Sequence, residues 1–450
     1  MEFNLTVDQI NDLIEKNEWG ILRNYLAEAN PVDIALLLEE LDNDKMLLVF
    51  RILPKDISAD VFSYMEDTEQ QAHVVESISN HEVRALIDDL FLDDTVDFLE
   101  EMPANVVTKV LRNTNETTRK LINQFLKYPD NSAGSLMTIE FIQFRLGWTV
   151  RRAMDHLRAN ATDSEMISTC FVVDERRHLQ GIVELRQLIL AEDDAIIDNI
   201  MEDTPLCVNT LDDQEYVASQ TQKYDLTSVP VTDKEGRLVG IITIDDVVDV
   251  IEEENTEDFE KMAAMQPSEE EYLKTGVFSM AKNRIVWLLV LMLSATFTGR
   301  IIQHYNDLLQ SAIVLAAYYP MLMNTGGNCG SQASTMVIRG MALGEIEWRD
   351  IFRVQWKELR VGFVCALVLS AVNFLRILIF EPAGATIAFV VSISLFATVI
   401  LSKFIGCTMP LLAKKVRLDP ALMASPLITT IVDACSLALY FFIATKLLAL

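Results

Sequence analysis

Residues 281–450 contain five apolar stretches, each long enough to cross a bilayer as a helix of about 20 residues. They run approximately over residues 285–303, 308–338, 361–380, 385–412 and 420–450. The charged residues divide at the same point, since residues 1–280 carry 58 acidic and 23 basic side chains and residues 281–450 carry 8 and 14. The chain is therefore expected to join an acidic soluble region to a membrane region.

The composition of the soluble region excludes several classes of protein. Its net charge of −35 repels phosphate backbones, so nucleic-acid binding is not expected. Leu, Ile, Val and Phe recur throughout and can form cores, which argues against disorder. The six cysteines have no CxxC spacing, so neither a disulfide framework nor a zinc site is expected. The acidic, amphipathic start lacks signal-peptide features, which predicts a cytoplasmic soluble region.

The second apolar stretch is too long for one simple span, and it contains a polar, glycine-rich run. Pro320 comes first, and NTGGNCGSQ follows over residues 324–332. We expect this run to interrupt the helix. Lipid cannot satisfy the backbone groups that an interruption frees, so the segment would have to line protein or water.

Basic residues near the ends of the stretches predict the orientation. With the amino-terminal region inside, ten Lys and Arg residues flank the inner ends and three flank the outer ends. This places the amino terminus in the cytoplasm and the carboxyl terminus outside. Lys403 lies near the inner end of the fourth stretch, where its stem is expected to reach the interface.

Asp433 is an acidic residue well inside the fifth apolar stretch. A carboxylate at the centre of a bilayer costs about 2.5–3.5 kcal/mol on insertion scales. It could be a structural residue that is protonated, paired with lysine or packed with Thr429 and Thr430. The alternative is a cation site on a pore axis. We favour the second, because ionisable groups inside membranes usually mark an ion path.

Residues 1–130 have apolar side chains at three-to-four spacing with charges between them, the pattern of amphipathic helices. Pro31, Pro54 and Pro103 fall near expected helix starts. Several units begin with a similar short acidic phrase. The pattern predicts an all-α domain built as a short solenoid.

A duplication follows. The runs CFVVD (170–174) and LQGIV (179–183) return 59 residues later as PVTD (230–233) and LVGII (238–242). Gly181 matches Gly240 and Asp174 matches Asp233, which predicts a β-hairpin followed by a helix in each copy. The duplication resembles a tandem pair of α/β CBS modules over residues 131–254, divided at about 132–199 and 200–254. In other proteins such pairs often bind adenine nucleotides.

Two residues of the second copy bear on nucleotide binding. Thr243 and Asp246 have a spacing suited to phosphate and ribose contacts, and the first copy lacks both. They could equally cap the following helix. The sequence leaves these alternatives open, with at most one well-formed site, for ATP.

Residues 245–258 contain eight carboxylates in fourteen residues. The run is expected to lead into a connecting helix over residues 255–281, ahead of the membrane domain of residues 282–450. A solvated acidic face is one interpretation. However, carboxylates three or four residues apart share a helix face and repel one another, and hard divalent ions with oxygen ligands are the natural compensation.

Together these features resemble the MgtE family of bacterial magnesium transporters over nearly the whole chain. The strongest matches are TGGNCGSQASTMVIRG over residues 325–340 and LDPALMASPLITTIVD over residues 418–433. The resemblance implies a homodimer in the bacterial plasma membrane, with a Mg²⁺-selective pore on the two-fold axis and no enzymatic activity. Two carboxylates across that axis balance one Mg²⁺, which keeps much of its water shell. The implied pore positions are Asp433, Thr335, Gly327, Thr429 and Ser331. At the position of Ser331 the family often has Asn.

The resemblance also implies regulatory Mg²⁺ sites among the cytoplasmic acids. The matching positions are Glu215, Asp225, Asp246, Asp249, Glu254, Glu257, Asp258 and Asp419, with Asp93 or Asp94. Abundant cytosolic Mg²⁺ would bridge these carboxylates and favour a closed state, and scarcity would let them repel one another and open the pore.

Three alternatives remain from the residues themselves. A transporter of Co²⁺ or Mn²⁺ would use the same oxygen-rich pore, although only His304 lies in the membrane region, which disfavours softer metals. An intramembrane metalloprotease would need metal-binding histidines such as HExxH, which the sequence lacks. A magnesium sensor that does not conduct would leave Asp433 unexplained.

Overall fold

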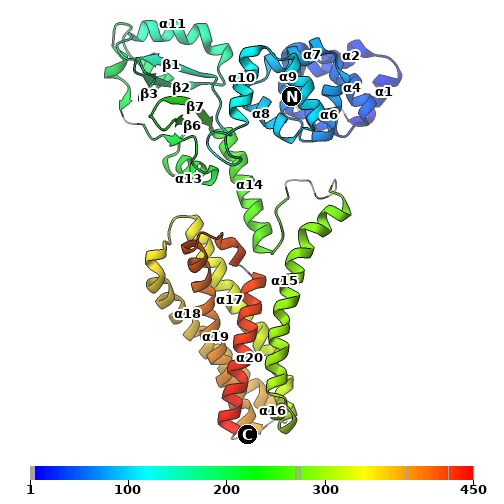
Figure 1. Ribbon diagram of the computed structural model, residues 1–450, viewed down its shortest axis with the longest axis vertical. Helices are drawn as coiled ribbons and strands as arrows, with labels where there is room; N and C mark the ends of the chain where they lie inside the picture. The colour runs from blue at the N-terminus through cyan, green and yellow to red at the C-terminus, as the bar shows by residue number, and fades with distance from the viewer. Residues whose placement is uncertain are drawn as a thin grey trace. The chain divides into compact units, whose positions relative to one another are not determined.

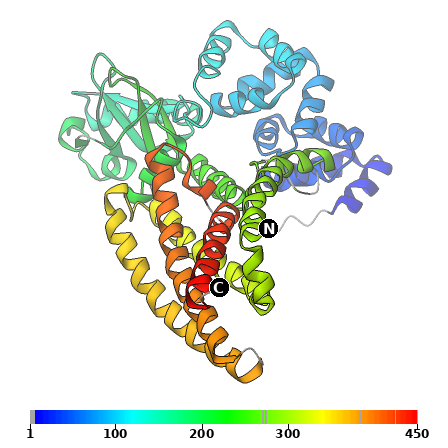
Figure 2. The ribbon, with the colours of Figure 1, turned by 60° about the horizontal axis from the view of Figure 1, so that its bottom comes forward.

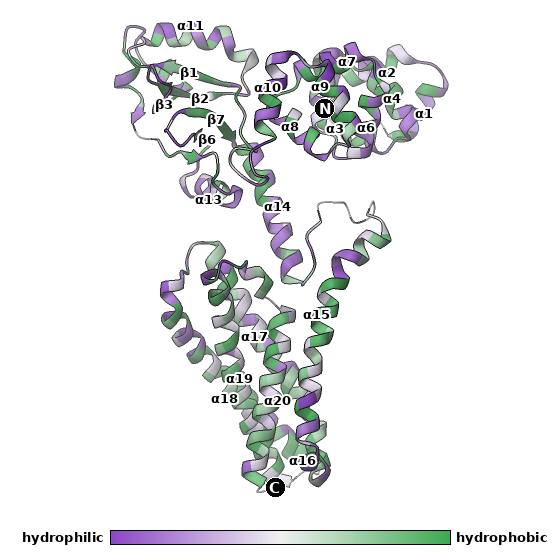
Figure 3. Ribbon diagram, viewed as in Figure 1, coloured by the Kyte–Doolittle hydropathy of each residue, from purple (hydrophilic) through white to green (hydrophobic). Residues whose placement is uncertain are grey.

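The computed structural model of the chain describes residues 6–203, 205–268, 272, 275–381, 384–423 and 425–448. Its contacts divide the chain into two compact units, Met1–Ile251 and Glu252–Leu450. Hydropathy differs between the units: the short helices of the first alternate between polar and apolar residues, and the long helices of the second are dominated by apolar ones (Figure 3).

The first unit begins with short helices arranged as a solenoid (Figure 1). In chain order they are α1 (Val7–Glu15), α2 (Trp19–Glu28), α3 (Pro31–Glu39), α4 (Asn43–Ile52), α5 (Lys55–Ser63), α6 (Thr68–Ser77), α7 (Asn80–Asp89), α8 (Leu92–Glu101), α9 (Ala104–Asn113) and α10 (Glu116–Phe125). Helix α3 packs on α5, α5 on α7 and α7 on α9, while α4 packs on α6 and α8 on α10. Their buried side chains share one apolar core, and the predicted all-helical domain is confirmed.

Prolines and polar caps set where these helices begin. Pro31 is the first residue of α3, and Pro54 and Pro103 are the N-caps of α5 and α9. At the start of α7, Ser79 and Glu82 form a reciprocal capping box, in which each side chain accepts a hydrogen bond from the other residue's backbone N–H. The helix starts predicted at the three prolines are therefore confirmed.

Two small sheets and their helices complete the first unit. The elements are β1 (Phe141–Arg145), α11 (Val150–Asn160), η1 (Ala161–Asp163), β2 (Met166–Val173), β3 (Leu179–Glu184), α12 (Leu185–Leu190), η2 (Ile197–Asn199), β4 (Glu202–Asp203), β5 (Val208–Asn209), α13 (Gln214–Tyr224), β6 (Ser228–Thr232), β7 (Leu238–Thr243) and α14 (Ile244–Met262). Among the described residues the sheet orders are β1-β2-β3-β4 and β5-β6-β7. In each, a parallel pair is followed by an antiparallel hairpin.

The duplication seen in the sequence is a structural repeat. Gly181 in β3 and Gly240 in β7 each pair with a valine at the same place in their hairpins. Asp174 and Asp233 each accept two backbone N–H hydrogen bonds within the hairpin turn. The two turns meet through an antiparallel bridge. The predicted hairpin-and-helix unit is confirmed in both copies.

The connecting helix ends earlier than predicted. The sequence predicted a helix over residues 255–281, but α14 ends at Met262 and the next helix, α15, begins at Val277. Ala264 has a left-handed backbone with φ of 56°, and Pro267 follows soon after. Both features stop a helix, because the first turns the chain and the second lacks the backbone N–H.

The second unit is a bundle of long helices. Its elements are α15 (Val277–His304), α16 (Asn306–Ser311), η3 (Ile313–Ala317), α17 (Tyr319–Ala342), η4 (Trp348–Asp350), α18 (Ile351–Phe380), α19 (Gly384–Lys415), η5 (Pro420–Met423) and α20 (Ser425–Leu448). Helix α18 lies beside α19, and α17 packs against both α19 and α20 (Figures 1 and 2).

Among the described residues, four segments are long and apolar enough to cross a membrane: Val277–His304, Trp348–Phe380, Gly384–Lys415 and Pro420–Leu448. Helix α17 is more polar. Its 24 residues nevertheless give it a length of about 36 Å, against about 30 Å of bilayer hydrocarbon. The fifth predicted span therefore stays a prediction that rests on α17.

The glycine-rich run does not interrupt α17, contrary to the prediction, because helix α17 continues through it. Its glycines allow close packing instead. A Cβ placed on Gly406 of α19 would lie 2.2 Å from the carbonyl oxygen of Gly330, and one placed on Gly326 would lie 3.1 Å from Ser402 Oγ. Small residues let membrane helices approach backbone to backbone, which offsets the weak helix propensity of glycine.

Lys403 is buried in the bundle, so the prediction that its stem reaches the interface is wrong. Its side chain is 7% exposed, and its Nζ lies 3.5 Å from Oε2 of Glu358 on α18, whose side chain is 15% exposed. The stem also approaches Gly362 of α18. A carboxylate on the neighbouring helix thus neutralises the charge inside the bundle.

Candidate functional site

The predicted pore residues lie along α17 and α20. A Cβ placed on Gly327 of α17 would lie 3.1 Å from Thr429 Cγ2 and 3.6 Å from Asp433 Oδ1, both on α20. Ser331 and Thr335 follow Gly327 on α17 at intervals of four residues, so the three share one helix face. The structure therefore brings Gly327, Thr429 and Asp433 together and places the other two along the same face of α17.

A polar face runs along α17 within an otherwise apolar bundle. Asn324, Asn328, Gln332 and Thr335 are all exposed within the single chain. Asn328 Nδ2 donates a hydrogen bond to Asn324 Oδ1 at 3.4 Å. Side-chain amides and hydroxyls are costly against hydrocarbon, so this face is suited to water or to another protein surface.

Asp433 is half-buried on α20. Within the described part of the chain its carboxylate has no hydrogen bond and no ion pair. The lysine-paired structural aspartate, one of the interpretations left open by the sequence, therefore has no support among the described residues.

Three carboxylates converge in the first unit. Asp93 comes from the first turn of α8, Glu165 from the residue before β2, and Asp246 from the first turn of α14. One oxygen of each lies within 4.8 Å of the other two. We call these three residues the acidic triad. The sequence indicated Asp246 and one of Asp93 and Asp94, but it missed Glu165, which lies in a short loop with no pattern of its own.

Burial and mutual repulsion make the triad electrostatically unfavourable. Asp93 Oδ1 and Glu165 Oε2 are buried and have no hydrogen-bond partner among the described residues. Burial, reinforced by the neighbouring carboxylates, holds the pKa of Asp93 well above its usual range. The same two causes raise the pKa of Glu165 to about 7, against smaller opposing effects of hydroxyl groups, and that of the adjacent Asp94 to about 6.

A divalent cation would relieve this repulsion. Opposite ligands of an octahedral Mg²⁺ stand about 4.2 Å apart at about 2.1 Å per bond. The triad oxygens all lie within 4.8 Å of one another, so a small approach would let one ion contact all three. An all-carboxylate donor set also suits a hard ion rather than a soft metal. Asp93, Glu165 and Asp246 therefore fit a hard divalent cation.

Asp246 also fixes the start of α14. Its Oδ2 accepts hydrogen bonds from Thr243 Oγ1 at 2.5 Å and from the Thr243 backbone N–H at 3.2 Å. Thr243 is 1% exposed. This is the geometry of a helix cap, one of the two alternatives for this pair, and it leaves the Thr243 hydroxyl engaged within the protein.

A second group of acids surrounds a lysine at the end of α14. Lys261 Nζ lies 2.6 Å from Glu257 Oε1 and 2.7 Å from Asp419 Oδ2, in the connection between α19 and α20. Burial, together with Asp419 and Glu254, raises the pKa of Asp258 to about 6. Although burial lowers it, hydrogen bonds to Asp419 and Glu257 raise the pKa of Lys261 to about 12. The sequence indicated the four acids but not the lysine.

The remaining predicted acids lie outside these two groups or at their edge. Glu215 and Asp225 are exposed at opposite ends of α13, about 15 Å apart along the helix axis. Asp249 lies one turn after Asp246 on α14 and adds to the raised pKa of Asp246, which has burial as its main cause. Within one chain the structure therefore does not join Glu215 to Asp225.

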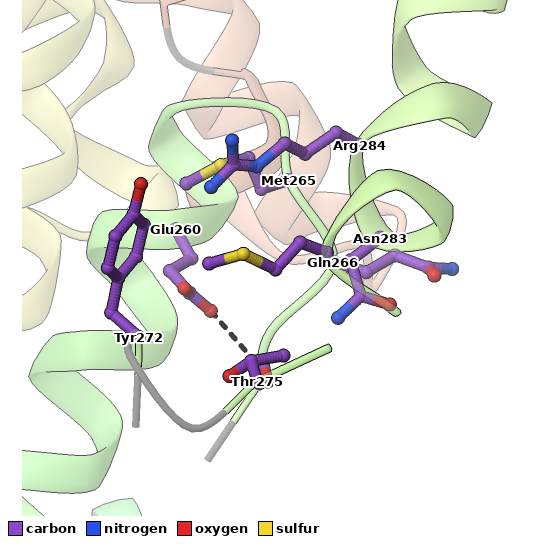
Figure 4. A pocket seen from close by; sticks show the side chains of 9 residues that line it. Glu260, Met265, Gln266, Tyr272, Thr275, Asn283 and Arg284 are labelled. Atoms are coloured by element: carbon purple, nitrogen blue, oxygen red, sulfur yellow. Dashed lines mark hydrogen bonds between the residues drawn. The ribbon is translucent and has the colours of Figure 1, made fainter. Parts of the chain in front are cut away.

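A small pocket lies where α14 is connected to α15 (Figure 4). The Glu260 carboxylate accepts a hydrogen bond from the Ser268 backbone N–H at 2.8 Å, and the Gln266 N–H donates to the Asn283 carbonyl at 2.9 Å. Arg284 of α15 also lines it. These contacts attach the end of α14 to the start of α15, and no predicted site residue lines the pocket.

Comparison with known proteins identifies the family. The family model for the MgtE divalent cation transporter matches residues 319–443, that for the MgtE intracellular N domain matches residues 29–131, and that for the CBS domain matches residues 133–194 and 197–253. The magnesium transporter MgtE of Thermus thermophilus is 35% identical over 453 residues, which cover 100% of this chain and 99% of the relative. The chain belongs to the MgtE family. The magnesium transporter MgtE of Bacillus subtilis is 30% identical, with 98% of each chain covered.

Solved structures agree with this membership. The cytosolic domain of the Mg²⁺ channel MgtE in complex with ATP is 35% identical, covers 54% of this chain and 99% of that one, and has a TM-score of 0.52. The soluble part of a magnesium transporter is 29% identical, covers 56% and 99%, and has a TM-score of 0.53. Within the MgtE modules, Asp93 falls in the N domain, Glu165 in the first CBS match and Asp246 in the second.

Proposed function

We propose that this chain conducts Mg²⁺ into the cell through a pore on the two-fold axis of a homodimer, with its amino terminus in the cytoplasm and its carboxyl terminus outside. The observation that carries the proposal is Asp433, a half-buried carboxylate without a partner among the described residues, beside Gly327 in a membrane bundle. The two full-length relatives compared above are named magnesium transporters, which supports Mg²⁺ as the cargo.

The charge balance favours two copies of Asp433 at one site. One carboxylate cannot neutralise a divalent ion, whereas two related by a two-fold axis can. Mg²⁺ gives up its water reluctantly. A site of two carboxylates, with the Thr429 and Gly327 carbonyls as the backbone groups that the family resemblance implies, would therefore hold the ion through its water shell. Thr335 and Ser331, which share a face of α17 with Gly327, would continue the proposed path with their side-chain oxygens.

The acidic triad is the proposed sensor of cytosolic Mg²⁺. It takes one carboxylate from each of three modules, so an ion bound there would hold the N domain and both CBS modules together. Loss of the ion leaves three buried, mutually repelling groups, which favours separation and an open pore. A relative's cytosolic domain was solved with ATP, and ATP binding at the CBS pair of this chain is part of the proposal.

Mg²⁺ uptake into liposomes that contain the purified full-length chain tests the function. We expect uptake by the wild type, loss of uptake in Asp433→Asn, and normal uptake in Glu345→Gln, which changes an exposed carboxylate outside the long helices. Normal uptake by Asp433→Asn would refute the pore assignment. No uptake by any variant would favour the non-conducting sensor, and faster uptake of Co²⁺ or Mn²⁺ would change the cargo.

A further inference from the structure

Three consecutive residues at the end of α14 contact three different parts of the second unit. Glu260 accepts a hydrogen bond from Ser268, on the path to α15. Lys261 forms an ion pair with Asp419, between α19 and α20. Met262 packs against the apolar cluster shared by α17 and α19. The end of α14 is thus placed to act on the helices that carry the pore residues.

Asp419 connects Lys261 to α20 through its two oxygens. Oδ2 lies 2.7 Å from Lys261 Nζ. Oδ1 accepts a hydrogen bond from the Ala421 backbone N–H at 2.8 Å and so fixes η5, the turn immediately before α20. Asp433 follows on α20. A displacement of Lys261 would therefore reach the helix that bears Asp433 through one side chain and one short turn.

The lysine is held in position by its own helix. Glu257 lies one turn before Lys261 on α14, and their ion pair at 2.6 Å aims the ammonium group toward Asp419. The Lys261 side chain is 20% exposed, less than either carboxylate. A partly buried ammonium with two carboxylate partners is expected to stabilise the contact more than an exposed ion pair does, because in an exposed pair the cost of ordering two mobile side chains offsets the attraction.

We propose that Lys261 is a built-in cation that holds α14 against Asp419 without a bound metal ion, and so supplies part of the closing force of the channel. The inference deepens the proposed function, since closure is the step that it explains. Mg²⁺ would then contribute the remaining force, at the acidic triad and at carboxylates that Lys261 leaves exposed. Removal of the lysine charge would make closure depend on Mg²⁺ alone.

The test uses the full-length chain in liposomes and varies internal Mg²⁺. Lys261→Gln is expected to raise the Mg²⁺ concentration for half-closure by about threefold to fivefold, the scale of one moderately strong ion pair. Lys261→Arg is expected to resemble the wild type. The conductance of the open channel should stay unchanged, because Lys261 is not a pore residue.

Lys414→Gln is the matched control, since Lys414 is an exposed lysine at the end of α19 without a side-chain partner among the described residues. A second measurement does not need conduction: amide hydrogen exchange of residues 418–423 without Mg²⁺ should speed up in Lys261→Gln and stay unchanged in Lys414→Gln. Unchanged exchange, or half-closure at equal or lower Mg²⁺ in Lys261→Gln, overturns the proposal. Failure of the wild type to conduct would refute the proposed function and still leave the exchange result to decide the Lys261 contact.

Discussion

The acidic triad predicts that one of its carboxylates weakens the protein when no metal is bound. Replacement of Glu165 by Gln keeps the size of the side chain and removes one buried charge. The pKa of Glu165 is raised from 4.5 to about 7, mainly by burial, and a shift of this size corresponds to about 3 kcal/mol if converted in full. Because solvent reaches part of the side chain, we expect Glu165→Gln to stabilise the metal-free protein by about 1–2 kcal/mol at pH 8.

The sign follows from proton linkage. A carboxyl group with a raised pKa in the folded state binds more protons there than in the unfolded state between about pH 4.5 and 7. Stability is therefore lost as the pH rises through this window and stays low above it. The advantage of Glu165→Gln over the wild type should thus be small at pH 5 and full at pH 8.

Hydrogen exchange of α8 and of the first turn of α14, in the full-length chain with a chelator, measures this difference. Mg²⁺ should protect the same amides in the wild type. At least about tenfold more Mg²⁺ should be needed in the variant, because loss of even an outer-shell partner of a metal ligand typically costs tenfold to a hundredfold in affinity. Glu175→Gln, in an exposed turn of the same CBS module, is the control. Equal protection of wild type and Glu165→Gln at pH 8, with and without Mg²⁺, would refute the reasoning.

Two further predictions concern the membrane unit. Lys403→Met should cost about 3–5 kcal/mol of stability because it leaves Glu358 buried without its partner, and the double variant Lys403→Met with Glu358→Met should recover most of this loss. Thermal unfolding in detergent measures both variants. Equal losses of stability in the single and double variants would contradict the prediction. Gly406→Ala places a Cβ 2.2 Å from the Gly330 carbonyl oxygen and should strongly lower the yield of folded protein. Gly276→Ala, with open space at its Cβ, is the control and should leave the yield unchanged. Size-exclusion profiles compare the two variants, and a monodisperse Gly406→Ala protein at normal yield would contradict the close contact.

Local signals in the sequence were sufficient for most of the fold. Proline positions predicted helix starts, and the matched Gly181 and Gly240 predicted two equivalent hairpins, because turn chemistry and strand pairing act over short distances. The glycine-rich run was misread for the opposite reason. Glycine weakens an isolated helix, and only the presence of α19 at close range, which the sequence does not display, makes the run of Gly326 and Gly330 favourable inside α17.

The candidate sites were predicted in part for the same reason. Asp433 was evident because a carboxylate in an apolar stretch is costly wherever the stretch lies. Glu165 was missed as a candidate metal ligand because it meets Asp93 and Asp246 only in the folded unit, from three separate segments of the chain. Only one of the two contacts of Lys261 could be predicted from the sequence. Its pair with Glu257 follows from their spacing on a helix, but Asp419 lies more than 150 residues further along the chain.

The contact between Gly330 and Gly406 restricts how this molecule can move. Where main chain rests on main chain there is no flexible side chain to absorb a displacement, so sliding of α17 along α19 by even one residue would drive a neighbouring side chain into the opposite backbone. Helices α17 and α19 are therefore expected to move together as a single rigid body. In the proposed channel, a change in pore width would then arise from a shift of α20, or of the second subunit of the proposed homodimer, relative to that body.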